Sequence, residues 1–378
     1  MKESAPHPDR LDTFFQDRWL VLSALGALLA LAAGVLAAHT LYVDRTRQAA
    51  VLAPAFVLRD QNGSLTSLAQ FRGKVVALTF IDPECTQLCP LTTQSMVEAL
   101  KILGPAAASQ VQLLGIDANP LKTQVSDVAS YTRTHELQGR WRFLTGSDSQ
   151  LKTAWQNYHV YVAVKNNDIQ HTAVVVLIDR RGYERDLFST PMSYQAVGDQ
   201  ARTLAQGIAS LLPRRPWIDA SVPAGKADDS PLAPSDSLRL AALGPHSQVI
   251  TLGSSHPHLV VFFAGWLDQS GDLSKDLATL DRYAALARRH GWPSPVAVDV
   301  LPTEPSPAEA RQVLDLLAAS LHTPIVQDSS GRLADGYHVA DLPWFVLNSS
   351  SGKILWRHDG WLSSSALDRD VRHAMSGT

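Results

Sequence analysis

Residues 74–90 read KVVALTFIDPECTQLCP and join a continuous apolar run to the only two cysteines of the chain. The run at 74–80 lacks the polar alternation of a half-solvated strand, which is typical of a central strand covered on both faces. Cys85 and Cys89 follow this strand, just before a helical pattern over 90–103. Ligands bind at the carboxyl ends of strands in open α/β sheets, and a helix N-terminus favours a thiolate. The sequence therefore predicts two reactive cysteines at the carboxyl end of a central strand, where ligands bind in such sheets.

The spacing of the cysteines indicates chemistry rather than scaffolding. One close pair cannot form the disulfide framework of a small secreted fold. Two sulfurs at positions i and i+4 can face the same way on a first helical turn and hold one ion, and soft thiolates select copper(I) or zinc over magnesium or calcium. The alternative, two small buried apolar side chains, is less favoured because chance seldom places a chain's only cysteines so close.

A third ligand is predicted at His171, one of 13 histidines, because it begins the apolar strand pattern HTAVVVLID at 171–179. Taken alone, a histidine at a strand end is more often a hydrogen-bonded structural residue. Beside the two thiols, the metal-ligand interpretation is favoured. Asp82 and Asp117, at the ends of two apolar runs, are interpreted as turn or capping carboxylates and not as ligands.

The surrounding pattern predicts an α/β domain over 50–211. Further expected elements are a strand at 56–58 with a turn at 60–63, a strand at 111–117, a helix at 124–135 and strands around 172–176. Strands that alternate with helices are typical of an α/β sheet. The formal net charge of −3 gives no reason to expect a nucleic acid as partner.

A second domain is predicted at 235–378. Residues 212–234, LPRRPWIDASVPAGKADDSPLAP, are rich in Pro, Ala, Asp and Ser without periodicity and are interpreted as a linker. Beyond them the apolar runs at 259–264, 296–300 and 345–348 follow in the same order as those of the first domain. The chain is therefore interpreted as two tandem copies of one architecture.

Residues 19–42, WLVLSALGALLALAAGVLAAHTLY, carry no charged side chain and are long enough for a transmembrane helix. A cleaved signal peptide is the alternative, but its apolar region is usually 7–15 residues, so an uncleaved anchor is favoured. The basic residues before the span weakly favour a cytoplasmic segment at 1–18. We expect a single-pass inner-membrane protein with both domains on the periplasmic side.

Residues 53–210 resemble the Sco/SenC family of copper-binding thioredoxin-fold proteins. One family mark is a C-x-x-x-C-P motif, here Cys85, Cys89 and Pro90, and the other is a His-Thr pair opening a late strand, here His171-Thr172. Supporting matches are Phe56-x-Leu58-x-Asp60-x-x-Gly63, Phe71-Arg72-Gly73-Lys74, Leu144-Thr145-Gly146, Ile178-Asp179 and Gly182.

The resemblance implies a trigonal copper site of Cys85, Cys89 and His171, whose cysteines can form a disulfide when copper is absent. It also implies copper delivery to, or thiol reduction at, the copper-centre subunit of cytochrome oxidase or another copper client. This chain departs from the family in Thr86-Gln87-Leu88, where an acidic residue is common, in the stretch DANPLK at 117–122, and in its additional C-terminal domain.

The second half resembles the membrane-anchored reductase branch of the thioredoxin superfamily. Its apolar run leads to Leu267-Asp268-Gln269-Ser270, where that branch has cysteines, and the approach to Pro343 resembles the approach to a cis-proline. Disulfide exchange needs a thiolate, so this half is interpreted as a binding or scaffolding module. Core packing is the favoured role for most of its tryptophans, with a recognition surface as the alternative: Trp266, Trp344, Trp356 and Trp361.

Three functions remain open from the sequence. A copper chaperone for oxidase assembly is favoured. A disulfide reductase of exported proteins is less favoured, because dedicated reductases use C-x-x-C and three residues separate Cys85 from Cys89. The third is a non-catalytic assembly or interaction subunit of a membrane complex.

Overall fold

The computed structural model describes residues 51–166, 168–216, 218, 231–244, 248–253, 256–267 and 272–376. Leu52–Thr378 form one compact unit. The predicted segments 1–18 and 19–42 and most of the predicted linker 212–234 lie outside the described residues. Within the described part of the chain, no helix is both long enough and apolar enough to cross a membrane.

The first sheet has seven strands in the order β2-β1-β5-β4-β3-β8-β9. Strands β3, β4 and β5 are parallel, whereas β8 runs antiparallel to β3 and β9 antiparallel to β8. All seven residues of β3 are buried, which explains the apolar run that begins the sequence argument. The strands are β1 (Val57–Asp60), β2 (Leu65–Ser67), β3 (Val75–Ile81), β4 (Val111–Asp117), β5 (Trp141–Thr145), β8 (Val174–Ile178) and β9 (Glu184–Ser189).

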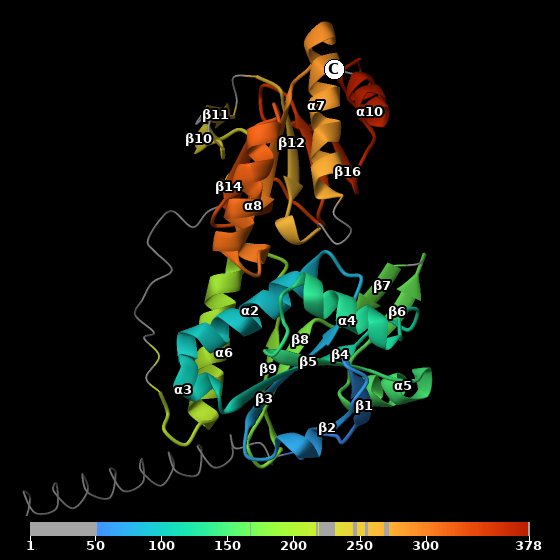
Figure 1. Ribbon diagram of the computed structural model, residues 1–378, viewed down its shortest axis with the longest axis vertical. Coiled ribbons are helices and arrows are strands. Elements are labelled where there is room, and N and C mark those ends of the chain that lie inside the picture. Colours follow the sequence, from blue (N-terminus) through green and yellow to red (C-terminus); the bar gives the residue numbers. More distant parts are fainter. Residues whose placement is uncertain are drawn as a thin grey trace, which may run out of the picture. The chain divides into compact units, whose positions relative to one another are not determined.

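Helices and a hairpin complete this N-terminal lobe, which we define as 52–212. The helices are η1 (Leu68–Phe71), α2 (Leu88–Leu103), α3 (Pro105–Ala108), α4 (Val125–Thr134), α5 (Asp148–Asn157) and α6 (Ala196–Leu211), and the hairpin is β6 (Val162–Lys165) with β7 (Asp168–His171). Helices α2 and α6 lie side by side (Figure 1). Alternate residues of β3 belong to two different apolar clusters, so the sheet is covered on both faces.

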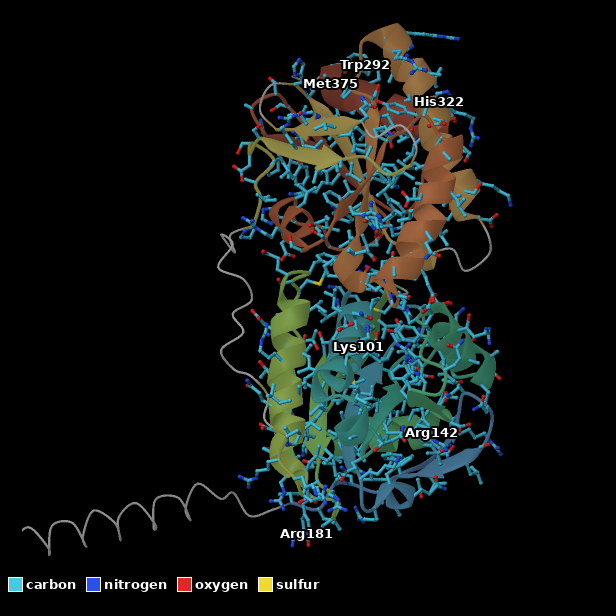
Figure 2. All side chains as sticks on the ribbon, turned by 60° about the vertical axis from the view of Figure 1, so that its left-hand side comes forward. Lys101, Arg142, Arg181, Trp292, His322 and Met375 are labelled. Carbon is cyan, nitrogen blue, oxygen red and sulfur yellow. The ribbon has the colours of Figure 1, made fainter. Side chains whose placement is uncertain are left out.

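The C-terminal lobe, defined as 231–376, has a five-stranded sheet in the order β14-β13-β12-β15-β16. Its elements are β10 (Leu238–Ala241), β11 (Val249–Leu252), β12 (His258–Phe263), η2 (Gly265–Leu267), α7 (Leu273–His290), β13 (Pro295–Val300), η3 (Leu301–Thr303), α8 (Pro307–Ser320), β14 (Ile325–Asp328), α9 (Arg332–Gly336), β15 (Trp344–Asn348), β16 (Ile354–Asp359) and α10 (Ser364–Ser376). Figure 2 shows the described side chains packed around the sheets of both lobes.

The two lobes share one strand arrangement. In each, three parallel strands are followed by two antiparallel ones, β5-β4-β3-β8-β9 and β14-β13-β12-β15-β16. The predicted α/β class and the repeated order of strands are therefore confirmed. The Leu342-Pro343 peptide bond is cis, as predicted.

The four tryptophans considered for a recognition surface pack against the apolar cores of the C-terminal lobe, as favoured from the sequence. Trp266 is buried, and the other three are half-buried: Trp344, Trp356 and Trp361. Of the four residues that stand where the related reductases have cysteines, 268–270 lie outside the described residues.

One strand prediction is wrong. His171 does not open the late core strand but is the last residue of β7, and β8 begins at Val174. The reason is the β6–β7 hairpin, in which His171 pairs with Val162. This hairpin is half-exposed and partly polar, so it lacks the apolar pattern that marks the core strands.

Candidate metal centre

The turn between β3 and α2 is fixed by Asp82. Its Oδ1 accepts hydrogen bonds from the N–H of Glu84 at 2.9 Å and from Nδ2 of Asn119 at 2.7 Å, and its carbonyl oxygen accepts the N–H of Cys85 at 3.1 Å. Burial raises the pKa of this carboxyl group. The interpretation of Asp82 as a turn carboxylate is confirmed, and this turn presents Cys85 at the end of β3.

The two sulfurs differ in environment. Cys89 lies in the first turn of α2 and is 2% exposed, whereas Cys85 is half-buried. Both are free thiols, and the N–H of Cys89 points at Sγ of Cys85 over 3.5 Å. Hydrogen bonding from the Cys89 side chain lowers the pKa of Cys85, while burial raises the pKa of Cys89 well above its ordinary value. Cys85 is therefore the sulfur that ionises first.

His171 faces Cys89. Its Nε2 lies 3.6 Å from Sγ of Cys89, and its Nδ1 lies 3.2 Å from the carbonyl oxygen of Thr172. A carbonyl oxygen only accepts, so Nδ1 carries the proton and Nε2 directs its lone pair toward the sulfur. Burial lowers the pKa of His171, which keeps the ring neutral. This is the state in which imidazole binds metal ions.

The spacing of Cys89 and His171 fits one shared ion. Thiolate and imidazole ligands at about 2.3 and 2.0 Å from a tetrahedral ion stand roughly 3.5 Å apart, close to the 3.6 Å found here. Within the described residues no group of three His, Cys, Asp or Glu side chains is arranged to hold an ion as it stands. The three predicted residues therefore lie near one another, and Cys89 and His171 are at the spacing of two ligands of one ion. The role of all three as ligands stays a prediction.

Asp117 is buried behind this turn and is not directed at the sulfurs. Its Oδ1 accepts the N–H of Asn119 at 2.9 Å, as expected of a turn carboxylate. Oγ1 of Thr145 lies 2.9 Å from Oδ2 of Asp117 and also 2.9 Å from the carbonyl oxygen of Thr123. The Thr145 hydroxyl group is the donor toward both oxygens. Burial raises the pKa of Asp117 to about 8.

The rim of the site holds two features that bear on charge. Glu84, the residue before Cys85, forms an exposed ion pair with Lys122, which offsets its charge. Thr86 and Gln87, between the cysteines, donate hydrogen bonds to the carboxylate of Asp341 in the C-terminal lobe. Sequence reasoning missed Asp341, because no local pattern links positions so far apart.

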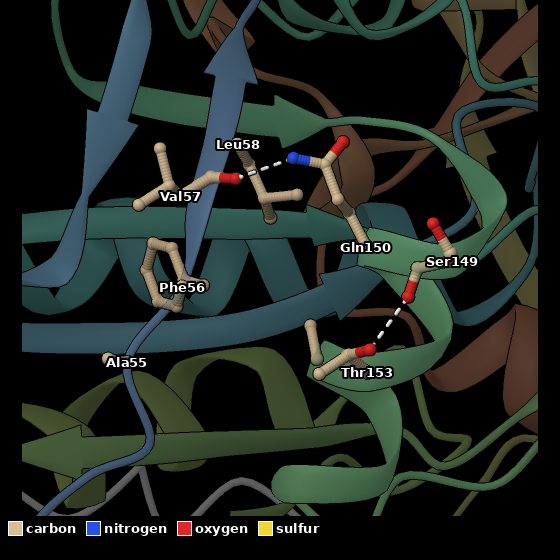
Figure 3. Close-up of a pocket in the computed structure, with 8 residues that line it drawn as sticks. Ala55, Phe56, Val57, Leu58, Ser149, Gln150 and Thr153 are labelled. Atoms are coloured by element: carbon tan, nitrogen blue, oxygen red, sulfur yellow. Dashed lines mark hydrogen bonds between the residues drawn. The ribbon is translucent and has the colours of Figure 1, made fainter.

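A separate hollow of about 270 Å³ lies between β1 and α5 (Figure 3). Its polar groups bond within the lobe: Nε2 of Gln150 donates to the carbonyl oxygen of Val57 at 3.1 Å, and Oγ1 of Thr153 to that of Ser149 at 2.8 Å. None of its lining residues is ionisable. It therefore offers no acid, base or metal ligand.

Comparison with known proteins matches most of the N-terminal lobe to one family model. Residues 44–206 match the family model described as SCO1/SenC. The mitochondrial SCO2 homolog of Bos taurus is 28% identical over 176 residues, covering 45% of this chain and 65% of that protein. Protein sco1 of Schizosaccharomyces pombe is 25% identical over 145 residues, covering 36% of this chain and 54% of that protein. The chain thus spans less than two thirds of the length of these relatives.

Solved structures of Sco proteins are similar to part of this chain. ScoI of Bradyrhizobium japonicum with copper bound is 22% identical and has a TM-score of 0.36, covering 43% of this chain and 100% of that one. ScoI of Arabidopsis thaliana, also with copper bound, is 19% identical with a TM-score of 0.38, covering 42% and 99%. BsSco, described as a member of the Sco family of cytochrome c oxidase assembly proteins, is 20% identical with a TM-score of 0.36, covering 44% and 98%. The SCO1/SenC family model thus matches most of the N-terminal lobe, and the match ends before the C-terminal lobe begins.

Proposed function

We propose that this protein binds copper(I) through Cys85, Cys89 and His171 and delivers it during assembly of cytochrome c oxidase or a related copper enzyme. The observation that carries the proposal is the 3.6 Å approach of Cys89 Sγ and His171 Nε2 inside a SCO1/SenC domain. Two sulfurs and one imidazole nitrogen form a soft donor set that favours copper(I). Relatives of known structure are copper-bound ScoI proteins, which supports the choice of metal.

Each residue has a distinct part in taking up the ion. Cys85 ionises first and is accessible to a copper donor, so it makes the first contact. Cys89 has a raised pKa because it is buried, and it gives up its proton when the ion arrives. His171 needs no proton change, since its Nε2 is unprotonated and its ring is held by the Thr172 carbonyl oxygen. Uptake therefore releases protons from the thiols and strengthens as pH rises.

A membrane anchor belongs to the same proposal. The uncharged stretch at 19–42 supports one transmembrane helix, with 1–18 on the cytoplasmic side and both lobes outside the inner membrane. Copper enzymes assembled at that face would then be within reach of a tethered site.

The C-terminal lobe is proposed to be a second thioredoxin-like domain, at 235–378, without redox chemistry. The support is its strand order, which repeats that of the N-terminal lobe. The whole C-terminal half contains no cysteine, so it cannot exchange disulfides. Its contribution is binding, and the contacts of Asp341 identify the segment between Cys85 and Cys89 as one of its targets.

Copper transfer and disulfide reduction can be separated in one experiment. The full chain, purified in detergent and loaded with copper(I), is mixed with the copper-free soluble domain of the oxidase copper-centre subunit, and copper is followed in both. The same preparation is assayed for turnover of a model disulfide. Transfer from the wild type but not from Cys89→Ser, without catalytic turnover, supports the chaperone. Rapid disulfide turnover without transfer would favour the reductase instead.

A further inference from the structure

Asp341 joins the C-terminal lobe to the three residues between the cysteines. It lies between α9 and β15, and its carboxylate accepts hydrogen bonds from Oγ1 of Thr86 and, at 3.1 Å, from Nε2 of Gln87. Its Oδ1 also accepts the N–H of Leu342 at 2.7 Å, which fixes the orientation of the carboxylate. Both oxygens are thus engaged with the segment that sets the distance between the two sulfurs.

The hydrogen bonds of Asp341 with Thr86 and Gln87 are accompanied by buried apolar contacts between the two lobes. Leu91 of α2 and Tyr194, which precedes α6, are each 1% exposed and belong to an apolar cluster with Phe262 and Leu342. Polar groups of the N-terminal lobe also bond to a second carboxylate of the C-terminal lobe, Asp335: the N–H groups of Tyr194 and Gln195 at 2.8 and 3.2 Å, and Oγ of Ser193 at 2.7 Å. The lobe that carries Asp341 is held in place independently of Asp341.

Asp341 makes its hydrogen bonds to Thr86 and Gln87 in a structure whose two cysteines are reduced. Cys85 and Cys89 are free, and the N–H of Cys89 lies 3.5 Å from Sγ of Cys85. Cys85 precedes α2, which begins at Leu88, so residues 86–88 link the two cysteines and set the separation of their sulfurs. A disulfide brings the two sulfurs from non-bonded contact to about 2.05 Å, which requires residues 86–88 to shift. Such a rearrangement works against the hydrogen bonds that Thr86 and Gln87 make with Asp341.

We propose that Asp341 is a positioning residue for the Cys85–Cys89 pair, acting from the C-terminal lobe to favour the dithiol over the disulfide. The role deepens the proposed function, on which it rests, because only the dithiol can take up copper(I). An external disulfide oxidises the pair: it accepts two electrons and two protons and leaves as a dithiol, while Cys85 and Cys89 form one sulfur–sulfur bond. An external dithiol reverses it and becomes a disulfide itself.

The test measures the reduction equilibrium of the full chain without copper. Wild type and variants are equilibrated with mixtures of reduced and oxidised dithiothreitol, and the free thiols are counted by alkylation and mass spectrometry. Loss of charge-assisted hydrogen bonds in Asp341→Ala is expected to shift the equilibrium roughly three- to tenfold toward the disulfide. This corresponds to a reduction potential about 15–30 mV lower. Thr86→Val is expected to shift it the same way by less, and to add little on top of Asp341→Ala.

Glu84→Gln is the matched control, because it also removes one negative charge near Cys85, and the ion pair that Glu84 makes lies within the N-terminal lobe, with Lys122. Its potential is expected to equal that of the wild type. An unchanged or raised potential in Asp341→Ala, or an equal shift in Glu84→Gln, overturns the role of Asp341. A wild type that binds no copper(I) refutes the proposed function instead, and leaves this copper-free comparison to be judged separately.

Discussion

Sγ of Cys89 lies 3.6 Å from Nε2 of His171, although 82 positions separate the two residues in the chain. Two different kinds of structure bring them together. The start of α2 presents Cys89 after the buried strand β3, and the β6–β7 hairpin ends at His171. Since Thr172 holds the other nitrogen of the ring, the histidine is oriented before any ion arrives.

Cys85 is expected to be the more reactive thiol of the copper-free protein. The Cys89 side chain lowers the pKa of Cys85 by hydrogen bonding, so Cys89→Ala should move the pH of half-maximal alkylation of Cys85 upward. The rate is measured with iodoacetamide and mass spectrometry between pH 6 and 10. A profile in the variant that is unchanged or displaced to lower pH would contradict the assignment.

Asp117 is expected to make stability fall as pH rises. Its pKa is about 8 in the folded protein against 3.8 ordinarily, so the folded state binds more protons between these values. Asp117 therefore contributes a decline in the free energy of unfolding from pH 4 to pH 8, and Asp117→Asn, whose amide does not titrate, removes that contribution. The free energy of unfolding of Asp117→Asn, taken relative to wild type, should be higher at pH 8 than at pH 4 by on the order of a few kcal/mol. Urea unfolding at both pH values measures this, and equal pH dependence in the two proteins would refute it.

Tyr194 is expected to stabilise the contact between the lobes through its ring and not through its hydroxyl group. The ring is 1% exposed, and the hydroxyl group has no hydrogen-bond partner among the described residues. Tyr194→Phe should keep or raise the melting temperature, while Tyr194→Ala should destabilise by about 3–5 kcal/mol. Calorimetry of the two variants checks this, and a large loss in Tyr194→Phe would show that the hydroxyl group matters.

The sequence predicted the parts of the fold that burial determines. Strand β4 occupies the predicted residues 111–117, because its apolar run is set by cover on both faces. The cysteine motif was equally visible, since two thiols at close spacing have few structural explanations. Those signals identified the two cysteines, while the role of the site as a metal centre stays a prediction.

Contacts between distant polar residues could not be predicted in the same way. The hairpin that carries His171 has exposed positions with no apolar period, so its extent was missed. Asp341 meets Thr86 across 255 positions through side chains that are common at any surface. Only the packing of the two lobes selects that pair.

The most direct test of the account is a copper(I) titration of the full chain in competition with a chelator of known affinity, repeated with His171→Ala. His373→Ala, an exposed histidine on α10, is the matched control. The account predicts about one tightly held ion per chain in the wild type and the control, and an affinity lower by at least roughly 100-fold in His171→Ala, because a lost ligand should weaken binding more than a lost outer partner. Equal binding by wild type and His171→Ala would contradict it.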